Sequence, residues 1–140
     1  MEEGVFMSLT GVAEMLKNAE AGGYAVGAFN CNNMEIVQAI VAAAGAENSP
    51  VILQASQGAI KYAGLDYIVA MAKLAAERTH VPVALHLDHG TSYEQAIQCI
   101  HAGFSSVMID GSKLPLDENI KLTRRVLDVA RAVGVSVEAE

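Results

Sequence analysis

The stretch from Val83 to Gly90 reads VALHLDHG, and it decides how the rest of the chain is interpreted. Its first residues are typical of a buried β-strand, yet two histidines and an aspartate crowd its end, just before the glycine. Titratable side chains are costly to bury unless they are paired or bind a metal. The stretch is therefore either a hydrogen-bonded patch of core or part of a functional site.

Composition limits the classes of protein to which the chain can belong. Its 140 residues are 52% hydrophobic and 5% aromatic, enough for a sizeable core of small aliphatic side chains. The net charge of −7 comes without a Lys/Arg cluster, so we expect no nucleic-acid partner and no membrane partner. No secretory signal pattern opens the chain, which predicts a cytoplasmic protein. Cys31 and Cys99 lack a metal-binding spacing, and we expect both to be reduced and buried.

Short Val/Ile-rich runs alternate with helical patterns, which is typical of consecutive βα units and a parallel sheet. The expected strands are 24–30, 51–56, 83–88, 106–110 and 135–140. The expected helices are 10–21, with Ser8 or Thr10 as its cap, then 34–46, 66–78, with Asp66 as its cap, 92–102 and 115–133; residues 57–65 are expected to be a loop. Residues 1–7 are interpreted as an N-terminal extension, and residues 8–140 as part of one domain.

Two architectures fit five such strands. An open doubly wound sheet would suit the number, but the first turn, NCNN at 30–33, is not a glycine-rich dinucleotide loop. A (β/α)8 TIM barrel needs about 250 residues, so this chain would supply its first half and slightly more.

Alternate side chains of a strand point to opposite faces of the sheet. The odd-numbered set is almost entirely apolar and is expected to face the helices. The even-numbered set becomes polar at the carboxyl end of every expected strand, at Asn30, Gln54, Ser56, His86, Asp88, Asp110, Glu138 and Glu140. In a barrel this set converges on the mouth, where such enzymes place their catalytic residues.

Crowded carboxylates in the mouth point to a metal. Like charges there would raise one another's pKa unless a cation is present, and a divalent metal resolves the conflict among Asp88, Asp110, Glu138 and Glu140. Some of them, Asp110 or Glu138, could instead only anchor loops. His89 follows the strand end and is expected to turn into the mouth as a ligand, with zinc the metal that best suits imidazole. His86 lies one layer deeper and is expected to be a hydrogen-bond partner.

Five motifs, in their order and spacing, closely resemble class II, metal-dependent fructose-bisphosphate aldolases, a family that also includes tagatose-bisphosphate aldolases. The motifs are YAVGAFNCNN (24–33), SPVILQASQGA (49–59), VPVALHLDHGTSYE (81–94), AGFSSVMIDGS (102–112) and GVSVEAE (134–140). The resemblance implies a TIM barrel, of which this chain supplies the N-terminal helix, the first four βα units and the fifth strand.

The resemblance also implies an activity. This is the reversible aldol cleavage of fructose 1,6-bisphosphate to dihydroxyacetone phosphate and glyceraldehyde 3-phosphate, as in glycolysis and gluconeogenesis, through an enediolate that zinc stabilises. Asp88 matches the general acid and base at the C4 oxygen, and His89 matches a ligand of the catalytic zinc. The other implied roles are a second divalent metal or displaced zinc position at Asp110 and Glu140, substrate contacts from Ser56 and Asn30, and supporting positions for His86, Glu138 and Gln54.

Two alternatives concern the substrate and the class of aldolase. Tagatose-bisphosphate aldolases are associated with a second histidine after the Asp-His pair and a threonine ending strand two, so Gly90 and Ser56 favour fructose bisphosphate. A Schiff-base aldolase would need a lysine aimed into the barrel, and the lysines lie on expected helices and loops.

The family's two further zinc histidines, its phosphate loops and its C1 base lie beyond residue 140. We therefore expect a homo-oligomer or a complementary C-terminal segment, or else an inactive fragment or non-catalytic subunit.

Overall fold

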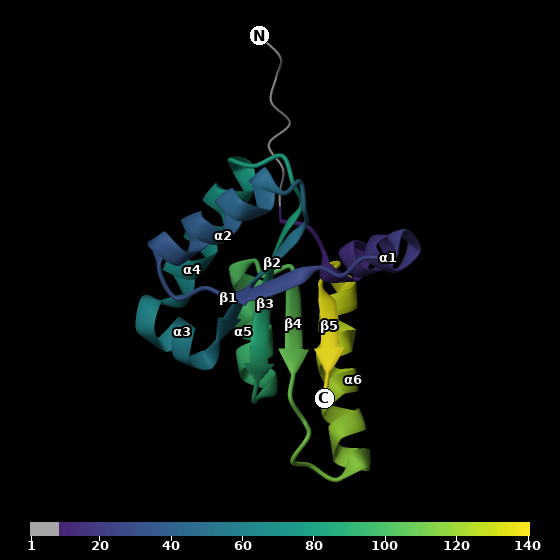
Figure 1. The fold of residues 1–140 in the computed structure, drawn as a ribbon. Coiled ribbons are helices and arrows are strands. Elements are labelled where there is room, and N and C mark those ends of the chain that lie inside the picture. Colours follow the sequence, from purple (N-terminus) through teal and green to yellow (C-terminus); the bar gives the residue numbers. More distant parts are fainter. Residues whose placement is uncertain (1–8) are drawn as a thin grey trace.

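Residues 9–140, the part that this computed structural model describes, form a parallel sheet in the order β1-β2-β3-β4-β5 (Figure 1). The strands are β1 (Gly27–Asn30), β2 (Val51–Ser56), β3 (Val83–Gly90), β4 (Ser106–Ile109) and β5 (Ser136–Ala139). The helices are α1 (Val12–Gly22), α2 (Met34–Ala46), α3 (Gln57–Ala63), α4 (Leu65–Glu77), α5 (Tyr93–Ala102) and α6 (Leu116–Ala132). The strand order never reverses, which excludes the doubly wound sheet.

The main core lies between the outer face of the sheet and the helices. Leu53, Leu85 and Val107 are fully buried there and belong to one apolar cluster with residues of α2, α4, α5 and α6. These are odd-numbered strand positions, so the predicted orientation of this set is confirmed. Phe29 is the exception, because β1 is an edge strand and leaves its side chain 52% exposed.

Helix α1 covers the inner face of the sheet at its amino-terminal end. Val12 and Met15 of this helix pack against Ile52 and Ala84 in a second, smaller cluster. Figure 1 shows α1 beside the start of β5, away from the arrowheads, and Ala13 N donates a hydrogen bond to Ser136 Oγ at 3.0 Å. The carboxyl end of the inner face is therefore available to the polar side chains.

Several predicted boundaries are wrong for local reasons. Residues 57–63 form α3 instead of a loop, because Ser56 Oγ accepts a hydrogen bond from Ala59 N at 3.2 Å and caps the helix. Gly64 precedes α4, so Asp66 lies in its first turn and is not its cap.

At the first helix, α1 has Gly11 at its N-cap with no side-chain bond, so Thr10 does not cap it. Ser8 and the extension at 1–7 lie outside the described residues. Strand β3 runs on to Gly90, two residues past the predicted end. Within residues 9–140, no helix is both long and apolar enough to cross a bilayer.

The main core predicts a contrast between two leucine substitutions. Leu85 is 0% exposed in β3, so Leu85→Ala should lower the free energy of unfolding by about 3 kcal/mol, measured by urea denaturation. Leu116 at the start of α6 is 73% exposed, so Leu116→Ala should change it by less than about 0.5 kcal/mol. Equal losses in the two variants would contradict the described packing.

Candidate active site

A bulge near the end of β3 shapes the candidate site. Leu87 pairs with Val107 and Gly90 with Ile109, so β3 has one more residue than β4 over this interval. His89 has a φ of 50°, in the left-handed region that is uncommon outside glycine. A Cβ on Gly90 would lie 2.4 Å from Met108 O, so the strands approach this closely because residue 90 is glycine. The bulge frees Asp88 and His89 from strict alternation.

Beyond the bulge, β3, β4 and β5 bring together an imidazole and two carboxylates. His89 Nδ1 lies 3.0 Å from Asp110 Oδ2 and 3.7 Å from Glu140 Oε2. One possible ligand atom from each residue lies within 4.8 Å of the others. These are donors that zinc and other divalent metals accept. The sequence predicted these three residues as metal ligands, and we call them the metal group.

A hydrogen bond between His89 and Asp110 dominates the electrostatics of the metal group. The Ser112 hydroxyl donates to Asp110 Oδ1 at 2.6 Å, and this bond, with one from His89, lowers the pKa of Asp110 to about 2. The hydrogen bond to Asp110 and the nearby Asp88 carboxylate raise the pKa of His89. Sequence reasoning missed Ser112, although an Asp-x-Ser spacing after a strand is a signal for such a turn.

Asp88 is oriented separately from the metal group. Gln54 Nε2 lies 3.3 Å from Asp88 Oδ1, and Asn30 Nδ2 lies 3.4 Å from Asp88 Oδ2, so each carboxylate oxygen accepts one amide hydrogen bond. Gln54 was predicted to support the site, and in the structure its amide contacts Asp88. Asn30 was predicted to line the substrate site, and in the structure its amide contacts Asp88. Ser56, the other predicted substrate contact, uses its oxygen as the cap of α3.

His86 and Glu138 form a deeper pair. The His86 side chain is 2% exposed, with Nδ1 2.8 Å from Ser106 Oγ and Nε2 3.4 Å from Glu138 Oε2. Burial lowers the pKa of His86, while the carboxylates of Glu138 and Asp88 act in the opposite direction. Of the four carboxylates expected to crowd the mouth, only Asp110 and Glu140 belong to the metal group, because Glu138 lies opposite His86 and Asp88 contacts the amides of Gln54 and Asn30. The supporting position of Glu138 stays a prediction.

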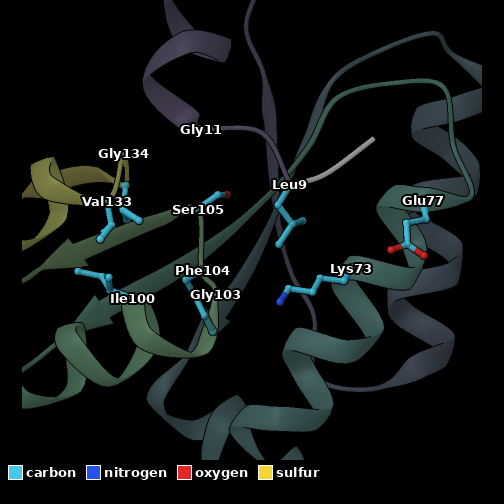
Figure 2. Close-up of a pocket in the computed structure, with 11 residues that line it drawn as sticks. Leu9, Gly11, Lys73, Glu77, Ile100, Gly103, Phe104, Ser105, Val133 and Gly134 are labelled. Atoms are coloured by element: carbon cyan, nitrogen blue, oxygen red, sulfur yellow. The ribbon is translucent and has the colours of Figure 1, made fainter. Parts of the chain in front are cut away.

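Two further features belong neither to the metal group nor to the side-chain contacts of Asp88 and His86. A cavity of about 420 Å³ is lined by Lys73, Glu77, Phe104 and neighbouring residues, with no predicted site residue among them (Figure 2). Cys31 and Cys99 are buried and unpaired, as predicted, and burial raises the pKa of their thiols to about 11 and about 12. Neither thiol is poised as a nucleophile.

Comparisons with known proteins point to one family. A family model described as fructose-bisphosphate aldolase class-II matches residues 10–140. A fructose-bisphosphate aldolase of Helicobacter pylori strain J99 is 53% identical over 128 residues, covering 91% of this chain and 42% of that protein. A probable fructose-bisphosphate aldolase of Bacillus subtilis is 53% identical over 137 residues, covering 96% and 48%. The chain thus spans less than half the length of these relatives.

The fold is likewise similar to a solved aldolase structure. The YdjI aldolase from Escherichia coli K12 superposes with a TM-score of 0.88 at 31% identity, over 94% of this chain and 51% of that one. The five parallel strands and their helices therefore correspond to part of an aldolase barrel.

The left-handed backbone at His89 predicts a difference between two variants that both lack the imidazole. A side chain with a Cβ is disfavoured at a φ of 50°, so His89→Gly should be more stable than His89→Ala by about 1 kcal/mol. Urea denaturation of the metal-free proteins measures the difference. An alanine variant as stable as the glycine variant would contradict the bulge.

The contact between His89 and Asp110 predicts that the pKa of His89 depends on the Asp110 charge. Removing the charge of Asp110 removes the partner that favours the imidazolium, so Asp110→Asn should lower the pKa of His89 toward its ordinary value. An NMR titration of the metal-free chain measures this pKa. Asp128→Asn, at an exposed position of α6, is the matched control and should leave it unchanged. A pKa of His89 that is the same in both variants would mean that the pair does not form in solution.

Proposed function

This chain belongs to the class II fructose-bisphosphate aldolase family, and from this premise we propose that it is the N-terminal part of an enzyme that cleaves fructose 1,6-bisphosphate reversibly to dihydroxyacetone phosphate and glyceraldehyde 3-phosphate. The observation that carries the proposal is the metal group of His89, Asp110 and Glu140 beside the oriented carboxylate of Asp88. The names of the relatives support the same substrate.

The donor set of the metal group fits a divalent metal, and we propose zinc. His89 would be a ligand of the catalytic zinc, while Asp110 and Glu140 would hold a second divalent ion or a displaced position of the first. Their atoms lie close enough to His89 to serve either arrangement. A bound zinc ion would supply Lewis-acid polarisation of the substrate ketone.

Asp88 would move the proton at the C4 oxygen. Breaking the C3–C4 bond requires removal of the C4 hydroxyl proton, and the reverse reaction returns it to the aldehyde oxygen. The amides of Gln54 and Asn30 restrain the carboxylate that would perform both transfers. Fixing a catalytic group before substrate arrives reduces the entropy lost on reaching the transition state.

Substrate contacts and specificity are proposed from Ser56, Asn30 and Gly90. Ser56 Oγ accepts from Ala59 N, which leaves its own hydrogen free to donate to the glyceraldehyde 3-phosphate half. Gly90 and Ser56 favour fructose over tagatose bisphosphate, the alternative substrate. A role in glycolysis and a cytoplasmic location belong to the same proposal.

Full activity is proposed to require a complementary C-terminal segment. Within residues 9–140, β1 and β5 are the edge strands and no further strand pairs with either, and unpaired parallel edges can accept another strand. An apolar groove beside β1, of about 480 Å³, is lined by Phe29, Ile40, Ala43 and neighbouring residues. The alternative is a folded fragment or subunit without turnover. A homo-oligomer stays a prediction.

The test is an assay of triose phosphate release from fructose 1,6-bisphosphate with zinc, with and without the C-terminal half of the Bacillus subtilis relative. We expect activity only in the combined sample, and its loss on adding a strong chelator. Activity that survives chelation would contradict the metal mechanism. A combined sample that binds zinc but releases no triose phosphate would favour the non-catalytic alternative, and faster cleavage of tagatose 1,6-bisphosphate would reverse the substrate assignment.

In that combined sample, Asp88→Ala should reduce turnover by a factor of about 10² to 10⁴ while zinc stays bound, because the group that moves the proton is lost and the metal ligands are kept. Asp117→Ala, at an exposed position of α6, is the control and should leave turnover unchanged. Turnover and zinc content are measured on the same samples. Loss of zinc from the Asp88 variant would show that Asp88 is a ligand.

A further inference from the structure

The carboxyl ends of β3, β4 and β5 carry two layers of polar side chains, and each layer has a histidine of β3 and a glutamate in β5 or directly after it. The outer layer is the metal group. The deeper layer consists of His86, Ser106 and Glu138, joined by the contacts of 2.8 and 3.4 Å around the imidazole. The bulge lets the three-residue step from His86 to His89 on β3 match the two-residue step from Glu138 on β5 to Glu140 just past its end.

One nitrogen of the His86 imidazole has no hydrogen-bond partner among residues 9–140. Nε2 is buried and makes no hydrogen bond of good geometry to any residue in 9–140, although Glu138 Oε2 lies 3.4 Å away. A buried neutral ring carries one proton, and an ionised carboxylate can only accept a hydrogen bond. The tautomer that satisfies both neighbours therefore has its proton on Nε2, directed at Glu138, with the Ser106 hydroxyl donating to Nδ1.

Strand β5 needs such an anchor, because it is an edge strand that pairs only with β4 in the described chain. Just past the end of β5, the backbone oxygen of Glu140 accepts hydrogen bonds from Asn119 Nδ2 at 2.8 Å and from Gly111 N at 3.0 Å. On the inner face, Glu138 and Glu140 are two residues apart and point the same way. Holding the Glu138 carboxylate therefore restrains the direction of Glu140.

We infer that Ser106 is a positioning residue: its hydroxyl, donating to Nδ1, favours the Nε2-protonated form of His86, and the Nε2 proton directed at the Glu138 carboxylate 3.4 Å away holds β5 so that Glu140 reaches the metal group. Ser106 is 1% exposed and is not one of the three residues of the metal group. The role of Ser106 in catalysis rests on the proposed function. The contacts from Ser106 through His86 to Glu138 are present in the protein without metal and are tested separately.

The tautomer is measured by long-range ¹H–¹⁵N NMR on the metal-free chain with ¹⁵N-labelled histidine. The proton of His86 is expected on Nε2 in the wild type, and spread over both ring nitrogens in Ser106→Ala. Ser105→Ala is the matched control, because the neighbouring hydroxyl bonds the Leu85 backbone and not His86. A wild-type proton on Nδ1, or an unchanged tautomer in Ser106→Ala, overturns the inference.

The effect on Glu140 is measured as the affinity of the same chains for Co²⁺, followed by visible absorption. Ser106→Ala and Glu138→Ala should each bind Co²⁺ about tenfold more weakly, whereas Glu138→Gln keeps an acceptor for Nε2–H and should bind like the wild type. Wild-type affinity in Ser106→Ala overturns the positioning role. Failure of the wild type to bind Co²⁺ would count against the metal site of the proposed function. The NMR measurement of the His86 tautomer would still test the contacts from Ser106 through His86 to Glu138.

Discussion

At His89 the backbone of β3 turns into the left-handed region, and the geometry of the candidate site depends on that one residue. A regular strand would send Asp88 and His89 to opposite faces. The bulge instead lets Asp88 contact the amides of β1 and β2 while the adjacent imidazole reaches the carboxylates of β4 and β5. Backbone conformations of this kind cost energy and persist where the surroundings hold them, as the close approach of Gly90 to Met108 does here.

The two faces of the sheet differ, and the stability from the outer face offsets the cost of a polar site on the inner face. The outer face is buried under helices in a continuous apolar cluster, which supplies most of the hydrophobic stabilisation. The inner face is apolar under α1, at Ile52 and Ala84. Toward the carboxyl ends it passes from the buried His86, whose pKa is lowered by burial, to the contact between the exposed His89 and the half-buried Asp110, so the polar side chains nearest the strand ends are the ones that water reaches.

Much of this arrangement could be predicted from the sequence, because strand alternation is a strict geometric rule. The apolar set with Leu53 and Leu85 and the polar ends with Asp110 and Glu140 follow from it directly. The helix at 57–63 could not be predicted, since its cap, Ser56, is also the last residue of a strand. The bulge was hidden because a glycine after a histidine is equally typical of a simple turn. The partnership of His86 with Ser106 and Glu138 depends on the registers of three strands, which spacing along the chain does not give.

The most direct measurement of the metal site is the position of zinc in crystals of this chain grown with the ion, located by anomalous scattering at the zinc absorption edge. A single site bounded by the side chains of His89, Asp110 and Glu140 is the expected result. Zinc bound instead at His86 and Glu138, or elsewhere on the surface with the metal group empty, would contradict the assignment on which the proposed aldolase chemistry rests.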